Sequence, residues 1–146
     1  MRRFAIFCGL AAASVSTAAA ATVPPRALLS GFVCHHAGNP LNREISITSV
    51  MRPVPGTQRM ALKFELQRSM GGSPFADVKS GDLGKWIYTS NPPTLGQQPG
   101  DVWRYNKPVV NLPAGEYRFR VAFRWLGSDT NVLRTAVRFS PRCDQP

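Results

Sequence analysis

The chain has 146 residues, of which 18 are lysine or arginine and 8 are aspartate or glutamate, so its formal net charge is +10. This length corresponds to a single domain. Beyond the amino-terminal leader the sequence has no internal repeat, no low-complexity segment and no apolar stretch long enough to cross a bilayer. These features exclude repeat proteins, disordered tails and multispanning membrane proteins.

The first residues have the pattern of a signal peptide. Arg2 and Arg3 precede an apolar run that ends in small residues, and Ala19 and Ala21 occupy the small-x-small positions before a cut ahead of Thr22. An uncleaved membrane anchor is the alternative, because the run is near the minimum length for a bilayer span. The run consists mostly of alanine and serine, which are too weakly hydrophobic to favour a membrane span, so we predict that the signal peptide is cleaved.

The leader defines the predicted domain boundaries and the compartment. We expect a signal peptide at residues 1–21, a short linker at 22–26 and one domain at 27–146 of a protein that is secreted, extracellular or periplasmic. Cleavage removes Cys8 and lowers the net charge by two.

Two cysteines then remain, Cys34 and Cys143. In an exported chain they predict one disulfide that encloses nearly the whole domain. Two free thiols, or metal ligation beside His35 and His36, are the alternatives. Successive side chains of a strand point to opposite faces, and a zinc site usually needs two cysteines close in sequence. We therefore predict no metal site and no cofactor.

From Ala27 onwards, apolar residues recur at every second position, which is typical of strands. Strands are expected, in chain order, at Ala27–His36, Arg43–Met51, Arg59–Arg68, Lys85–Ser90, Asp101–Leu112, Leu112–Gly127 and Val132–Ser140. A Pro-Gly turn separates the second and third strands, so these two are expected to form a hairpin. Prolines and glycines mark residues 91–100 as a loop, and Pro108 marks a bulge or an edge strand.

No segment has apolar residues at helical spacing for three turns, so the fold class is predicted to be all-β. About seven short strands with proline and glycine in the turns indicate a β-sandwich or a small barrel. Since each strand has one apolar and one polar face, we expect two antiparallel sheets that bury their apolar faces against each other.

The segment NLPAGEYRFRV, residues 111–121, resembles the start of the penultimate strand in fibronectin type III and related bacterial immunoglobulin-like domains. There a leucine and a Pro/Gly turn precede a tyrosine that hydrogen-bonds back to the turn. In this sequence the leucine corresponds to Leu112, the turn to Pro113–Gly115 and the tyrosine to Tyr117. The resemblance implies an immunoglobulin-like sandwich of about seven strands. Phe119 stands where antibody domains have a cysteine, and the resemblance implies no ligand.

Arginines alternate with apolar residues in the last two predicted strands. A short turn joins these strands, so they pair antiparallel, and five arginines are expected on one outer face: Arg118, Arg120, Arg124, Arg134 and Arg138. Guanidinium groups in such a row suit an anionic cell-wall polymer, an acidic glycan or another cell-surface component. The alternative is that they spread into solvent, or pair with Glu116 and Asp129 at the ends of the ribbon.

Other functions have less support in the sequence. The aromatic residues Trp103 and Tyr105 share one strand face and are expected in the core, apart from the arginines, so we predict no specific nucleic-acid binding. The chain has two adjacent histidines and none of the common catalytic motifs, so we predict that it is not an enzyme. The alternative function is a protein-interaction module that uses the loops at 91–100 and 127–131.

Overall fold

The computed structural model describes residues 23–146, and within them the protein is all-β with antiparallel sheets. The predicted signal peptide at 1–21 lies outside the described residues. Residues 23–26 form no regular structure before the first strand. Within residues 23–146 there is no helix with the length and apolar character to span a membrane.

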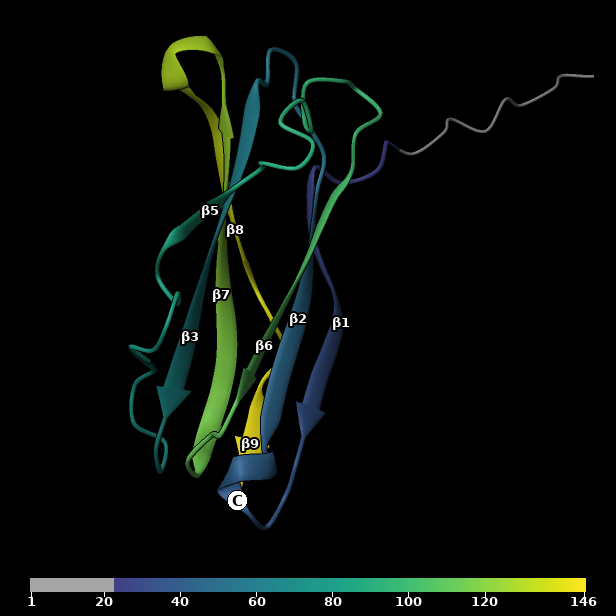
Figure 1. Ribbon diagram of the computed structural model, residues 1–146. Helices are drawn as coiled ribbons and strands as arrows, with labels where there is room; N and C mark the ends of the chain where they lie inside the picture. Colours follow the sequence, from purple (N-terminus) through teal and green to yellow (C-terminus); the bar gives the residue numbers. More distant parts are fainter. Residues whose placement is uncertain (1–22) are drawn as a thin grey trace, which may run out of the picture.

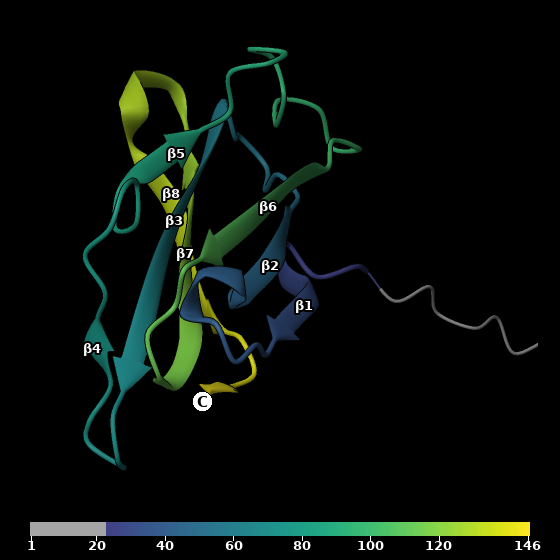
Figure 2. The same cartoon turned by 60° about the horizontal axis from the view of Figure 1, so that its bottom comes forward.

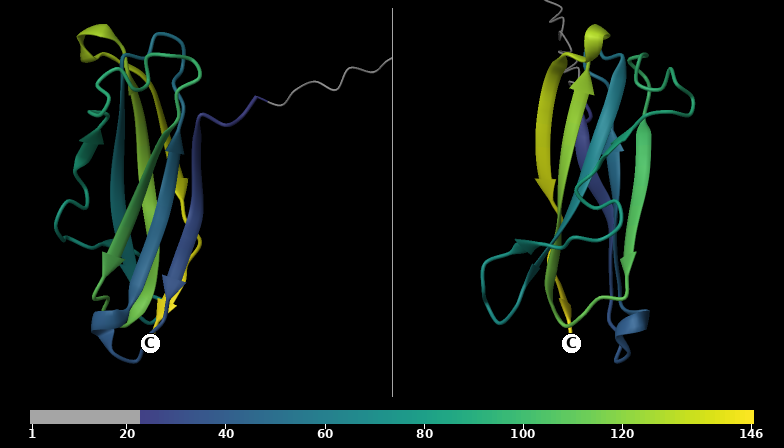
Figure 3. Two further views of the ribbon diagram at one scale, coloured as in Figure 1. Left: turned by 45° about the vertical axis from the view of Figure 1, so that its right-hand side comes forward. Right: turned by 60° about the vertical axis from the view of Figure 1, so that its left-hand side comes forward.

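The strands form two sheets that face each other along the long axis of the molecule (Figures 1 and 3). The smaller sheet has the order β1 (Ala27–His35), β2 (Glu44–Met51), β6 (Trp103–Val110). The larger sheet has β3 (Arg59–Ser69) and β7 (Gly115–Leu126) at its centre. Its other strands are β4 (Ala76–Asp77) and β5 (Trp86–Tyr88), which pair with β3, and β8 (Val132–Phe139) and β9 (Cys143–Gln145), which pair with β7. Two short 3₁₀ turns complete the fold, η1 (Pro40–Asn42) and η2 (Ser128–Thr130).

The predicted hairpin between Arg43–Met51 and Arg59–Arg68 is wrong. β2 pairs with β1 and β6, whereas β3 pairs along its whole length with β7. Residues 52–58 carry the chain from one sheet to the other, and the Thr57 hydroxyl closes this turn by accepting a hydrogen bond from Val54 N at 3.0 Å. The Pro-Gly signal marked a turn correctly, but a turn can join two sheets as well as two paired strands.

Figure 2 shows the two sheets from the end of the molecule where the chain terminates. The core lies between the sheets and takes side chains from both of them. Its largest fully buried members are Trp125, Tyr117, Phe64, Phe119, Phe123, Ile45, Ile47, Met51, Met60, Leu62 and Leu66. Trp103 is 9% exposed, and Tyr105 packs against Phe64 with ring centroids 5.7 Å apart. These contacts confirm that β6 supplies its aromatic rings to the core. Pro108 lies on β6, which is an edge strand of the smaller sheet.

The turn before β7 has the expected tyrosine hydrogen bond. The Tyr117 hydroxyl donates to the Pro113 carbonyl oxygen at 2.8 Å, and Leu112 is buried beneath the turn. Gly115 has φ +145°, and a Cβ on this residue would lie 3.0 Å from the Ser69 carbonyl oxygen. The turn therefore needs glycine at this position. Burial raises the pKa of the Tyr117 hydroxyl, which outweighs the lowering by the nearby Arg68 charge.

Substituting Tyr117→Phe tests the contribution of this turn. The variant keeps the ring, which is 1% exposed, and loses the hydrogen bond to Pro113. We expect the free energy of unfolding to fall by about 1 kcal/mol, because the variant loses a partly buried hydrogen bond. Urea denaturation measures this loss. A variant as stable as the wild type would show that water replaces the hydroxyl at no cost.

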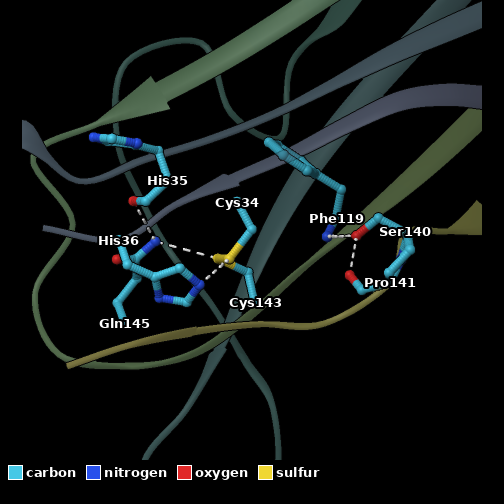
Figure 4. The surroundings of a disulfide bond; sticks show 8 residues. All are labelled: Cys34, His35, His36, Phe119, Ser140, Pro141, Cys143 and Gln145. Carbon is cyan, nitrogen blue, oxygen red and sulfur yellow. Dashed lines mark hydrogen bonds between the residues drawn. A yellow bond between two sulfur atoms is a disulfide. The ribbon is translucent and has the colours of Figure 1, made fainter.

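The predicted disulfide between Cys34 and Cys143 is confirmed, with Cα atoms 5.6 Å apart (Figure 4). It joins the end of β1 to β9 and so links the smaller sheet to the larger one. Gln145 supports the same link, since its Nε2 donates to the His35 carbonyl oxygen at 3.1 Å. The alternatives of two free thiols and of cysteine metal ligands are thereby excluded.

Candidate anion-binding face

The outer face of the larger sheet carries a cluster of cations from both central strands. Tyr117, Phe119 and the other odd-numbered residues of β7 face the core, so its even-numbered residues face outward. The register between β3 and β7 places the outward residues of both strands side by side. We call the resulting set the arginine face: Arg59, Lys63, Arg118, Arg120 and Arg124.

The prediction that Arg134 and Arg138 share this face is wrong. Arg134 lies opposite Trp125 and Arg138 opposite Val121, and directly paired residues of antiparallel strands point to the same side. The two arginines therefore lie on the side of the larger sheet that faces the core. Since β8 is the edge strand, their side chains extend past the packed core and are exposed. The outer side of β8 instead presents Thr135, Val137 and Phe139.

A β-bulge causes this reversal. Leu126 pairs with Val132, but Trp125 pairs with Arg134, so Leu133 is one extra residue in β8. Without the extra residue, Arg134 would lie opposite Arg124. An insertion of one residue exchanges the two faces of a strand.

Aromatic rings hold three guanidinium groups of the arginine face. The Cζ atom of Arg124 lies 4.0 Å from the centroid of the Trp86 ring, and that of Arg59 lies 4.5 Å from the Tyr88 centroid. Arg118 lies over two rings, with its Cζ 4.1 Å from the Phe75 centroid and 4.8 Å from the Phe139 centroid. A guanidinium stacked in this way is fixed in position, while its in-plane N–H groups can still donate hydrogen bonds. One of them is already used in Arg118, whose Nε donates to Gln67 Oε1 at 2.9 Å, and Nε of Arg124 is buried.

Carboxylates neutralise only part of the arginine face. The Glu65 side chain, 13% exposed, accepts hydrogen bonds from Arg120 and from Lys63, the latter at 2.7 Å. Within residues 23–146, no carboxylate lies within 4.0 Å of the cationic groups of Arg59, Arg118 and Arg124. These three arginines are thus the uncompensated charges of the face.

The acids expected at the ends of the ribbon pair differently. Glu116 accepts from Arg142 at 3.2 Å, and no ion pair of Asp129 occurs in the part of the chain that the structure describes. The acid that does pair with the face, Glu65, belongs to β3. Only the register between β3 and β7 reveals this pairing.

The Glu65 pair makes part of the stability dependent on pH. Burial raises the pKa of the Glu65 carboxyl, but hydrogen bonds and charges from Lys63 and Arg120 outweigh burial and lower the pKa below its usual value of 4.5. A carboxyl with a lowered pKa stabilises the fold above its unfolded-state pKa, and this stabilisation is lost as the pH falls through the folded-state pKa.

We expect Glu65→Gln to flatten the fall in melting temperature below about pH 4.5, the usual pKa of this carboxyl. The measurement is thermal unfolding of both proteins from neutral pH to about pH 2.5. A matched control is Asp144→Asn, which changes an exposed carboxyl that is not part of the arginine face. If melting temperature falls with pH in the same way in the wild type and in Glu65→Gln, the lowered pKa of Glu65 is not the source of this pH dependence.

The two predicted loops occupy the same end of the molecule. Residues 91–100 and 127–131 lie beside the connection at 52–58 at the top of Figure 1. The Asp101 carboxylate orders the first loop by accepting hydrogen bonds from Gly96 N at 2.7 Å and Gln98 N at 3.1 Å. A cavity of about 170 Å³ at this end is lined by Arg26, Pro53, Val54, Pro55, Gly56, Gln97 and Pro99.

The two histidines lie next to the disulfide. His36 Nε2 lies 3.3 Å from Cys34 Sγ, and both His35 and His36 are exposed (Figure 4). Residues 23–146 contain no group of three or more possible metal ligands.

Comparisons with protein-family models, curated proteins and solved structures give no match to the chain. Function is therefore inferred from the residues themselves.

Proposed function

We propose that the protein is a secreted, non-catalytic binding or structural module, built as an immunoglobulin-like sandwich, whose arginine face engages an anionic polymer or cell-surface component. One observation carries the proposal: Arg59, Arg118 and Arg124 are stacked on aromatic rings and have no carboxylate partner within the described chain. The cations are fixed in place and remain uncompensated.

The sheet order supports the architecture. Three strands, β1, β2 and β6, face a sheet centred on β3 and β7, and the tyrosine before β7 bonds back to its turn. Both features are expected of immunoglobulin-like domains. A disulfide between the two sheets is compatible with an extracellular or periplasmic location.

The chemistry of the face favours a repeating anion. Arg118, Arg120 and Arg124 lie along one strand, where alternate residues are roughly 6.6 Å apart. Stacked guanidinium groups bind carboxylate, sulfate or phosphate groups through paired N–H donors and lose little conformational entropy. A polymer contacts several of them at once, so weak single contacts add up.

The test compares two triple variants on immobilised heparin, an acidic polysaccharide. Arg59→Gln/Arg118→Gln/Arg124→Gln removes the uncompensated cations of the face. Arg104→Gln/Arg134→Gln/Arg138→Gln is the matched control, since it removes equal charge from exposed arginines elsewhere. Each ionic contact releases counterions, so affinity falls as salt concentration rises. We expect only the first variant to reduce the slope of log affinity against log salt concentration, by roughly 2 units.

Two results would contradict the proposal. Elution of the wild-type protein below physiological salt would show that the face does not bind an acidic polymer. Equal losses in both variants would show that net charge alone, and not the arginine face, causes retention. Circular dichroism confirms that both variants are folded before the comparison.

A second candidate function is protein recognition by the loops at 91–100 and 127–131. It is favoured by the position of both loops at one end of the molecule, next to the cavity that Gln97 and Pro99 line. Exchanging both loops for Gly-Ser linkers leaves the arginine face intact. Retained heparin binding together with loss of a protein partner would support this second function.

A further inference from the structure

The last long strand, β8, is an unpaired edge of the larger sheet. It pairs with β7 on one side only, and in Figure 3 it forms the outermost strand of that sheet. Ser140 N donates to the Phe119 carbonyl oxygen at 3.0 Å, so even-numbered backbone groups of this segment point towards β7. By the alternation of an antiparallel ladder, the N–H and C=O groups of Thr135, Val137 and Phe139 point to the open edge.

Side chains on β8 give the edge two different faces. Phe139 is 51% exposed and Val137 is 37% exposed on the outer side. Arg134 and Arg138 are exposed on the opposite side, four residues apart. Within residues 23–146, neither arginine has a carboxylate within ion-pair distance. An added strand would therefore meet apolar groups on one side and two uncompensated cations on the other.

The backbone of the edge is held by a side chain of the same strand. Arg138 Nη1 donates to the Val137 carbonyl oxygen at 2.9 Å, and this carbonyl is one of those that point to the open edge. The bond occupies an acceptor that a new strand would use. A carboxylate on an incoming strand attracts the guanidinium of Arg138 and frees the Val137 carbonyl for pairing.

The same charges disfavour pairing of two copies of β8 about Ala136. Antiparallel self-pairing about Ala136 would place Arg134 of each copy opposite Arg138 of the other. Like charges directly opposite each other destabilise a sheet, whereas opposite charges stabilise it. In this register the edge repels a second copy, whereas the two arginines attract an acidic strand.

We propose that β8 is a docking edge for an extended polypeptide segment with acidic side chains on one face and apolar side chains on the other. The segment adds to the larger sheet as a further strand. Its acidic residues, four apart, lie opposite Arg134 and Arg138, and its apolar residues extend the surface of Val137 and Phe139. Arg134 and Arg138 lie on the opposite side of the sheet from the arginine face, whereas Phe139, over which Arg118 lies, borders both surfaces.

The probe is a capped peptide of sequence Val-Glu-Val-Ser-Val-Glu-Val, compared with the same peptide carrying lysine in place of glutamate. A third peptide keeps both glutamates but has N-methyl groups on alternate amides, which prevents strand pairing. We expect the acidic peptide to bind the wild-type protein about fivefold more tightly than the lysine peptide, and Arg134→Glu/Arg138→Glu to reverse this preference. Arg104→Glu/Lys85→Glu, which changes two other exposed cations, is the matched control and keeps the wild-type preference.

Amide hydrogen exchange identifies where the peptide binds. We expect the acidic peptide to slow exchange at Thr135, Val137 and Phe139, and the N-methylated peptide to leave it unchanged. Binding of the N-methylated peptide with the same affinity as the acidic peptide would show that charge attraction alone causes binding, without strand pairing, and would overturn the proposal. Slow exchange at these amides without peptide, together with a dimer in sedimentation velocity, would assign the edge to a second copy and also overturn it.

Discussion

Replacing both Cys34 and Cys143 by serine is expected to lower the free energy of unfolding by about 4 to 5 kcal/mol. The two cysteines are 109 residues apart, and a cross-link that closes a loop of this size removes much of the entropy of the unfolded chain. The loss is comparable to the whole net stability of a small domain. Guanidinium chloride denaturation measures it.

Reduction of the wild-type protein is the control for this prediction. The reduced wild type should unfold at the same denaturant concentration as the double serine variant, because both lack the cross-link and keep every other contact. Since the bond joins β1 to β9, hydrogen exchange in the smaller sheet should rise more than exchange in the middle of β7. An unchanged unfolding midpoint in the variant would contradict the expected contribution.

Trp125→Ala is expected to cost about 3 to 5 kcal/mol of stability. The Trp125 side chain is 0% exposed and stacks against Phe123 at an interplanar angle of 21°, with ring centroids 6.4 Å apart. Removing it leaves a cavity between the sheets, and the Arg52 carbonyl oxygen loses its hydrogen bond from Nε1, which is 2.7 Å long. Both losses act on the folded state.

Trp86→Ala is the matched control for Trp125→Ala. Trp86 is half-buried on the outer face, where it lies under Arg124. Its removal should cost about 1 kcal/mol or less in stability and should weaken heparin binding, because Arg124 loses the ring that fixes it. Equal destabilisation by the two substitutions would contradict the division between a core tryptophan and a surface tryptophan.

Alternation along single strands was a sound basis for predicting which side chains are buried. It placed Tyr117, Phe119 and Trp125 in the core, and it separated them from Arg118 and Arg124. These predictions depend only on residues within one strand. Apolar residues at every second position predict that one face of the strand is buried, whichever strand it pairs with.

Relations between strands were harder to predict. The hairpin of β2 and β3 was wrong because β2 pairs with the preceding strand β1 and with the distant β6, whereas β3 pairs with the distant β7. The face of Arg134 was wrong because one extra residue, Leu133, shifts the register of β8. A bulge has no strong local signature, yet it moves every later side chain to the opposite face.

The contacts that define the arginine face also arise from this long-range register. Trp86 reaches Arg124 because β5 pairs with β3, and β3 pairs with β7. Phe75 precedes β4, which pairs with β3, and Phe139 lies on β8, so the two rings approach Arg118 from the two flanks of β7. The sequence indicated an arginine-rich strand, but the stacked rings and the neutralising Glu65 became visible only in the folded arrangement.

The most direct test of the anion-binding account is an NMR titration of the arginine side-chain Nε–Hε resonances with a heparin octasaccharide. The account predicts shifts at Arg59, Arg118 and Arg124, with Arg134 and Arg138 unchanged. Shifts confined to Arg134, Arg138 or the loop at 91–100, with the stacked guanidinium groups unaffected, would contradict it.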